Sequence, residues 1–476
     1  MNLKNKFHLI RLFLTYKING EDFETQISKL LVRLIEKNSY LQIRFSPGLW
    51  RLYGWLHDQN LSLFSPVKKD KRRELGIDEI MSKNGIPRLL KLLSKGKYSK
   101  GKYIIGHTVI DLKLYSHLCQ GKASSFAIPD EFYSSLPKYS FKIQEENETQ
   151  WKDIFRDDFA LSRLKEILKY SDVFYIGSTR TKPFAAAIGI PEENHICIPN
   201  INSFHLRKTI VREITNKING INCPIIMHTA SIFGSTVLSE LANLNINFKG
   251  FDMGLAGSIF DFEYLAARGW FQSNAEAILS AGANSISPQL AKDFPKIADT
   301  LCYLNNDTDI KEFANELSIF NQIWCKSISM IKVNNIEMRV QAIRKLTKFL
   351  DRAKFYYYPY ARSTLLLWKL RFCNDLDLNL MDITSKEQLY CEPLISAYIV
   401  KFVSSYPKKE IDKLFERIKT ISPYEPILEE ITHLSSLDKS NDLASWDKLL
   451  TIQSRGDFCS RINWVLGGDL RSGRNK

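Results

Sequence analysis

Strands and helices alternate through the middle of this chain, and that alternation restricts the fold more than any other feature. Four short apolar segments bounded by turn residues have the character of strands. They are Asp172–Ser178, Asn194–Asn200, Cys223–Ser231 and Ile246–Gly254. Segments with apolar residues at helical spacing separate them. Because neighbouring parallel strands need a crossover helix between them, the pattern predicts a doubly wound parallel sheet.

The regions on either side of this segment have different patterns. On the N-terminal side, Phe23–Leu34 has helical periodicity and Tyr40–Phe45 is a short strand. After Trp270 the patterns are helical, as in the amphipathic segments Ile336–Lys354 and Ile411–Ile421. We therefore expect an α/β fold, with a Rossmann-like doubly wound parallel sheet and a mostly helical C-terminal region. The expected domains are an N-terminal α/β region at 1–135, a Rossmann-like domain at 136–275 and a helical region at 276–476.

The net charge of +14 favours a polyanionic partner, such as nucleic acid, anionic lipid headgroups or phosphorylated sugars. A lysine-favouring coding bias would give the same charge. Nucleic-acid binding is disfavoured because no helix-turn-helix, zinc or RNA-binding signature occurs. The eight cysteines are scattered without a CxxC motif, which indicates a reducing compartment and no zinc site.

No signal peptide and no apolar stretch of about 20 residues is found, so we expect a cytoplasmic protein, associated at most peripherally with the inner face of the membrane. The glycine- and lysine-rich run Gly96–His107 lacks the GxxxxGK[ST] spacing of a phosphate-binding loop. We expect a flexible surface turn there. A GxGxxG turn is also missing, which disfavours a nicotinamide-dependent enzyme.

Ligands of open parallel sheets bind outside the carboxyl ends of the strands. Three segments follow such strand ends and are expected to line one crevice: Gly177–Arg180, Ala230–Ser235 and Asp252–Gly257. Within the first of these, Gly177 and Ser178 are expected to contact a nucleotide.

The small-residue segment Ala230–Thr236 lies between an expected strand and the next helix. Gly234 would let the backbone approach a phosphate closely, and the helix N-terminus would attract it. Ser235 and Thr236 would add hydroxyl donors. The alternative is that small residues are needed there only for packing.

Asp252, at the end of another strand, is placed to accept hydrogen bonds from ribose hydroxyls, and Gly254 permits a tight loop around the ligand. The alternative is that Asp252 caps a turn. The acidic residues Asp261 and Glu263 are expected to face solvent.

An ordered set of these segments, over about residues 155–264, resembles the GT-D-type glycosyltransferases. It consists of DVFYIGS, then Asn200 and Phe204 before a helix, then CPIIMHTASIFGSTVLSELANLNINFKGFDMG and DFEY. The resemblance implies that the domain at 136–275 binds a nucleotide-sugar donor and that the sugar is transferred to a surface glycan or a lipid-linked acceptor.

The family also carries an acidic D-x-E motif that holds a divalent metal against the diphosphate. In one register Arg44 and Phe45 match the motif, but Pro47 and Leu49 occupy its carboxylate positions. In the other register Glu146 and Glu148 supply the carboxylates, as catalytic and metal-binding residues for Mn²⁺ or Mg²⁺. The alternative for this acidic stretch is a solvated turn.

Two further features are open to two interpretations. His228 is the best-placed imidazole for a general base, or else a buried structural histidine. The basic aromatic stretch Lys354–Arg371 either binds lipid, sugar or bases, or supplies the core and rim of a helical domain.

Three functions follow from these observations. The first is a bacterial glycosyltransferase that uses a nucleotide diphosphate sugar. The alternative is a non-catalytic or degenerate Rossmann-like binding protein. A third, suggested by charge alone, is polyanion or nucleic-acid binding through the basic surface.

Overall fold

The computed structural model of this protein describes twelve stretches of the chain. They are residues 23–37, 39–44, 102–106, 151–155, 157–199, 203–244, 246–254, 256–267, 286–304, 307–333, 335–373 and 408–424. The chain divides into two compact units. The first contains Met1–Ile176 and Phe204–Gly254, and the second contains Gly177–Ser203 and Leu255–Lys476. The first unit is made of two separate segments of the chain, because the chain leaves it after Ile176 and returns to it at Phe204. The three consecutive regions expected from the sequence stay a prediction.

The first unit is built on a parallel sheet. Its strands lie in the order β2-β1-β6-β5-β3, and each hydrogen-bonded pair for which a register is defined is parallel. They are β1 (Tyr40–Arg44), β2 (Lys102–Gly106), β3 (Val173–Ser178, the first four residues in this unit), β5 (Ile225–His228) and β6 (Lys249–Asp252). The register places His228 of β5 opposite Asp252 of β6, so the carboxyl ends of these two strands are level.

Strand β2 corrects one expectation. It lies inside the run Gly96–His107, which the sequence analysis assigned to a flexible surface turn, and it pairs with β1 from Lys102 to Gly106. The bulky residues Tyr103, Ile104 and Ile105 have high strand propensity, and the surrounding glycines and lysines obscured that signal.

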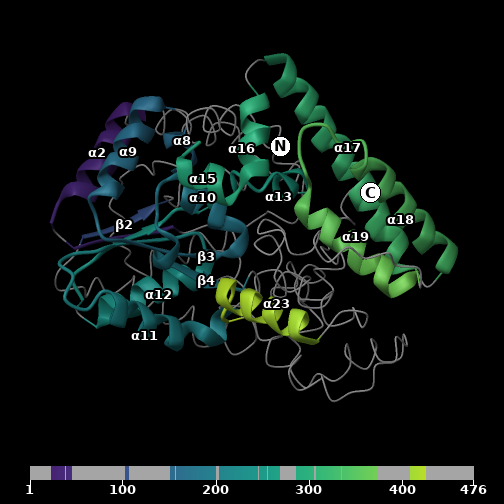
Figure 1. The fold of residues 1–476 in the computed structure, drawn as a ribbon. Coiled ribbons are helices and arrows are strands. Elements are labelled where there is room, and N and C mark those ends of the chain that lie inside the picture. Colours follow the sequence, from purple (N-terminus) through teal and green to yellow (C-terminus); the bar gives the residue numbers. More distant parts are fainter. Residues whose placement is uncertain are drawn as a thin grey trace, which may run out of the picture. The chain divides into compact units, whose positions relative to one another are not determined.

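Helices cover both faces of this sheet. Figure 1 shows α2 (Phe23–Ile35) and α9 (Asp158–Lys169) on one face, and α11 (Arg207–Lys217) and α12 (Ser231–Asn243) on the other. A short helix, α8 (Trp151–Ile154), precedes α9. The leucines of α9 that share one face by spacing are buried, as helical periodicity predicts. The described part of this unit is therefore an α/β structure with a parallel sheet.

The second unit is mostly helical in the part of the chain that the structure describes. Its elements are α10 (Lys182–Ala187), β4 (His195–Ile198), α13 (Phe262–Ala267), α15 (Pro288–Asp293), α16 (Pro295–Tyr303), α17 (Asp307–Lys332), α18 (Ile336–Leu350), α19 (Pro359–Phe372) and α23 (Lys408–Ile421). Figure 1 shows α17, α18 and α19 packed side by side.

Aromatic side chains form the core between these three helices. The rings of Trp324 and Trp368 stack with centroids 5.7 Å apart, and the rings of Phe320 and Tyr358 lie 4.6 Å apart. Tyr358 and Trp368 are fully buried. The aromatic residues of the stretch Lys354–Arg371 that the structure describes therefore supply core, which is one of the two interpretations the sequence allowed.

No helix in the described stretches combines the length and the apolar character that a bilayer crossing requires.

Candidate functional site

The carboxyl ends of β5 and β6 bring several of the predicted site residues together in the first unit. We call this group the strand-end cluster and define it as His228, Gly234, Ser235, Asp252 and Gly254. His228 and Asp252 are the last residues of their strands, and both are buried. Ser235 is buried as well, within α12.

Both carboxylate oxygens of Asp252 accept hydrogen bonds from the protein. Oδ2 accepts from the hydroxyl of Ser235 at 3.2 Å, and Oδ1 accepts from the backbone N–H of Gly254 at 2.9 Å. The second bond closes a turn directly after β6, as the capping alternative predicted. Asp252 thus ties α12 to the loop after β6, while its contact with a ribose stays a prediction.

His228 is fully buried, and neither ring nitrogen has a hydrogen-bond partner among the described residues. Its Nδ1 lies 3.9 Å from Oδ1 of Asp252, too far for a hydrogen bond. Burial lowers the pKa of the imidazole, against the opposing effect of the Asp252 charge. The ring is therefore neutral at pH 7 and keeps one donor and one acceptor that no described group satisfies.

Gly234 lies against this imidazole. A Cβ atom at Gly234 would lie 2.3 Å from Nδ1 of His228, so a larger residue would collide with the ring. Gly234 also lies inside α12, which begins at Ser231, and its N–H bonds to the carbonyl of Ala230 at 3.3 Å. The sequence analysis placed residues 230–236 in a connection ahead of the helix. In the structure, the residues from Ser231 onward already form the first turns of α12.

This earlier helix start changes the geometry expected for phosphate. The amides of Ser235 and Thr236 lie within the helical ladder rather than at its open end. Both side chains are buried. Any anion at this terminus would meet the amides of the first turn instead, and the binding roles of Gly234, Ser235 and Thr236 stay predictions.

The other two predicted nucleotide-binding residues, Gly177 and Ser178, belong to the second unit. The carbonyl of Ser178 accepts a hydrogen bond from the hydroxyl of Thr181 at 2.8 Å. The carbonyl of Gly177 lies 3.3 Å from Nε2 of His195. Both residues thus support the turn after β3.

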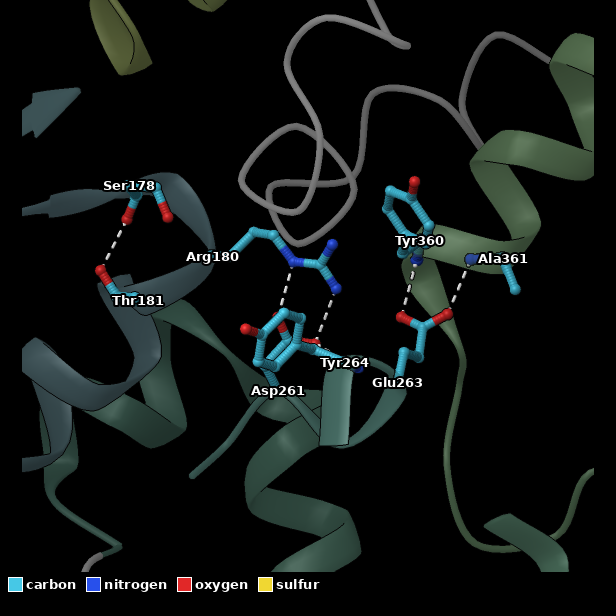
Figure 2. Close-up of polar contacts among 8 residues, drawn as sticks. All are labelled: Ser178, Arg180, Thr181, Asp261, Glu263, Tyr264, Tyr360 and Ala361. Atoms are coloured by element: carbon cyan, nitrogen blue, oxygen red, sulfur yellow. Dashed lines mark hydrogen bonds and ion pairs between the residues drawn. The ribbon is translucent and has the colours of Figure 1, made fainter. Parts of the chain in front are cut away.

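Arg180, in this turn, is the centre of a second group, the Arg180 cluster: Arg180, Asp261, Glu263, Tyr264 and Tyr360. Figure 2 shows Arg180 aligned with the carboxylate of Asp261 in a two-pronged ion pair. Nε lies 2.6 Å from Oδ2, and Nη2 lies 2.8 Å from Oδ1. The guanidinium also lies over the ring of Tyr360, 4.5 Å from its centroid.

Glu263 joins α13 to the start of α19. Its carboxylate accepts hydrogen bonds from the backbone N–H groups of Tyr360 at 2.9 Å and Ala361 at 2.7 Å (Figure 2). Burial raises the pKa of Glu263 to about 8, although these two bonds and the charge of Arg180 favour the ionised form. The expectation that Asp261 and Glu263 face solvent is wrong for both, because each carboxylate has buried partners.

A small pocket of the second unit is lined by Lys182, Glu192, His195, Gln289 and Asp293, with apolar residues between them. Lys182 pairs with Glu192 at 3.1 Å. Burial, helped by the Lys182 charge, lowers the pKa of His195 to about 3. This imidazole is thus neutral at pH 7 as well.

The predicted metal ligands Glu146 and Glu148 lie outside the described residues. Among the residues that are described, no group of three His, Cys, Asp or Glu side chains is arranged to hold a metal ion. Asp252 in particular already uses both oxygens within the protein. The metal prediction therefore rests on the two glutamates alone.

Comparisons with known proteins give no relatives. The chain matches no protein-family model, and searches of curated proteins and of solved structures find no significant match.

Proposed function

We propose that the chain is a glycosyltransferase whose Rossmann-like sheet binds a nucleotide diphosphate sugar at the strand-end cluster. The observation that carries the proposal is His228, a neutral imidazole that is fully buried at the carboxyl edge of a parallel sheet, with no hydrogen-bond partner among the described residues. Leaving such a group unsatisfied costs about 1–3 kcal/mol, so a ligand group or an ordered water that reaches the ring would recover up to that amount.

The arrangement of the strands adds support. Two of the segments that resemble the GT-D-type enzymes contain β3, β5 and β6, which are neighbours in one parallel sheet. Ligands bind at the carboxyl edge of such sheets, which is where His228 and Asp252 lie. The acceptor, a surface glycan or a lipid-linked sugar, and a location in the cytoplasm at the inner face of the membrane complete the proposal.

In the proposed reaction the acceptor hydroxyl attacks the anomeric carbon of the donor. As the new C–O bond forms, the bond to the nucleoside diphosphate breaks and the diphosphate leaves as an anion. The neutral His228 ring accepts the hydroxyl proton. Mn²⁺ or Mg²⁺ beside the diphosphate stays a prediction based on Glu146 and Glu148.

Thermal unfolding with and without nucleotides tests the donor site. A ligand at about 100 times its dissociation constant stabilises the folded state by about 2.7 kcal/mol, so one of UDP, GDP, CMP or TDP, or its sugar, should raise the midpoint. We expect His228→Gln to abolish that shift. The matched control is His195→Gln, which replaces a second neutral histidine that is half-buried and lies in the other unit, and it should keep the shift.

The same experiment has a clear contrary result. If none of these nucleotides raises the midpoint, with or without Mn²⁺, the donor-site proposal is wrong. If both histidine variants keep the shift, the nucleotide binds away from the strand-end cluster.

A second candidate is a non-catalytic nucleotide-binding protein. It is favoured by Asp252, because both of its oxygens already accept hydrogen bonds from Ser235 and Gly254 and serve the fold. Release of nucleoside diphosphate from the stabilising sugar nucleotide, with and without added glycan acceptor, separates the two functions. A transferase releases it, whereas a binding protein shows the thermal shift without release.

A further inference from the structure

Helix α18 presents a row of cations to solvent. Arg344 and Lys348 are exposed and lie four residues apart on one face of α18, and the exposed Arg352 follows in the turn after the helix ends at Leu350. Lys345 is beside them and half-buried. We call these four residues the α18 stripe. None of them forms a salt bridge with a described residue, so the described carboxylates do not neutralise the stripe.

The packing of α18 fixes the direction of the stripe. The opposite face carries Ala342, Ile343, Leu346 and Phe349, all buried. The helix lies against α17 and α19 through that face (Figure 1). Because turning the helix would expose these apolar residues, the cations are held outward.

Exposed apolar side chains lie at the amino end of the same helix. Val333, Ile336 and Met338 are 42%, 57% and 36% exposed. They lie within one six-residue segment that includes the connection between α17 and α18. We call these three residues the α17–α18 tip. Single exposed apolar residues are ordinary, but three together beside an unneutralised basic stripe are typical of surfaces that contact a bilayer.

The charge of the stripe alone would suit either nucleic acid or an anionic lipid surface. The apolar tip distinguishes these two partners. Phosphates of nucleic acid offer nothing to exposed aliphatic side chains, whereas the boundary between lipid headgroups and acyl chains does. Glu337 is the acidic residue within α18 and Asp351 directly follows the helix. Lys354 is already paired with Glu312 at 3.3 Å, so the four cations of the stripe outnumber these two carboxylates.

We propose that the α18 stripe and the α17–α18 tip bind an anionic lipid surface, the cations contacting headgroups and the tip entering the interface. This surface shares no residue with the strand-end cluster, and the proposal does not depend on the proposed donor site. The sequence analysis located a lipid-binding option in Lys354–Arg371, but the described aromatic residues of that stretch are largely core.

Vesicle flotation of the full chain tests this proposal. We expect binding to vesicles of mixed phosphatidylcholine and phosphatidylglycerol, none to phosphatidylcholine alone, and weakening by salt. Each cation near an anionic surface contributes about fivefold in partitioning, so Arg344→Glu with Lys348→Glu should weaken binding at least about 25-fold. Ile336→Ser with Met338→Ser should weaken it by a smaller factor and make the remainder more sensitive to salt.

The matched control is Lys208→Glu with Arg212→Glu on α11, an exposed pair of cations with the same spacing and the same change in net charge. It should bind vesicles like the wild type. Equal losses in both pairs, or no binding of the wild type to anionic vesicles, would overturn the proposal. Binding to duplex DNA that the α18 pair abolishes and the tip pair leaves intact, without vesicle binding, would overturn it in favour of nucleic acid.

Discussion

The two polar clusters of this protein are satisfied to very different degrees. In the Arg180 cluster, Arg180 and Asp261 form a two-pronged ion pair and Glu263 accepts two backbone N–H groups. In the strand-end cluster, His228 is fully buried and has no hydrogen-bond partner among the described residues. Charge is concentrated in the first cluster, whereas the unused hydrogen-bonding capacity is in the second.

The difference separates a structural role from a candidate functional one. The Arg180 cluster joins the turn after β3 to α13 and to the start of α19, so its charges are used in holding the second unit together. A buried group without partners contributes nothing of that kind to the fold. The strand-end cluster is therefore the better candidate for ligand binding, although it contains fewer charges.

Removing Asp261 should have the largest effect on stability. Asp261→Ala leaves the buried guanidinium of Arg180 without its carboxylate, which costs about 3–5 kcal/mol in buried pairs. Urea unfolding measures this loss, with Asp299→Ala, an exposed aspartate of α16, as the control that should change stability by less than about 0.5 kcal/mol. If the two variants are equally stable, the Arg180 cluster is not a structural clamp.

Adding one methyl group to the strand-end cluster should have an intermediate effect. Gly234→Ala places a Cβ atom in the His228 ring, and such overpacking costs about 1–3 kcal/mol. Helix propensity alone would make the same change favourable by about 1 kcal/mol. In a His228→Ala background the collision disappears, so the substitution should then be neutral or stabilising. The same loss in both backgrounds would show that the glycine serves another purpose.

Acid should also weaken the protein through its neutral histidines, by an amount that grows as the pH falls. Because burial lowers the pKa of His195 from 6.5 to about 3, the unfolded chain binds a proton in that range that the folded chain does not. Stability therefore falls as pH falls, by up to about 1.4 kcal/mol per pH unit for this group. In urea unfolding between pH 6 and pH 4, the free energy of unfolding should fall less steeply in His195→Gln than in the wild type. An unchanged slope would contradict the lowered pKa of His195.

The contribution of Glu263 to stability changes with pH in the opposite direction. It must therefore be separated from the contribution of the histidines. Its pKa is raised to about 8 from an ordinary value of 4.5, so the folded chain keeps a proton that the unfolded chain loses. Stability from this group falls as pH rises through that range. Comparing the wild type with His195→Gln at each pH removes this common contribution.

The sequence alone determined the local structure where apolar periodicity was strong. The spacing of Leu161, Leu164 and Leu168 predicted α9, and the apolar run through Val173–Ile176 predicted β3. Both predictions were possible because burial of a segment produces a pattern of apolar residues close together in the sequence. The placement of Asp252 at a strand end also followed from the pattern. Strand β2 was missed where glycine and lysine weakened the same signal.

Tertiary structure decided which residues meet and which stay unsatisfied. Arg180 and Asp261 are 81 residues apart, and Glu263 and Tyr360 are 97 apart, so no local spacing reveals either contact. Aspartate and glutamate in a polar stretch are usually solvated. Here Arg180 covers Asp261, and the backbone at the start of α19 covers Glu263. The collision that requires Gly234 likewise depends on the approach of α12 to β5. Apolar periodicity indicates which face of a segment is buried. The residues that a side chain contacts across the fold depend on packing between segments that are far apart in the sequence.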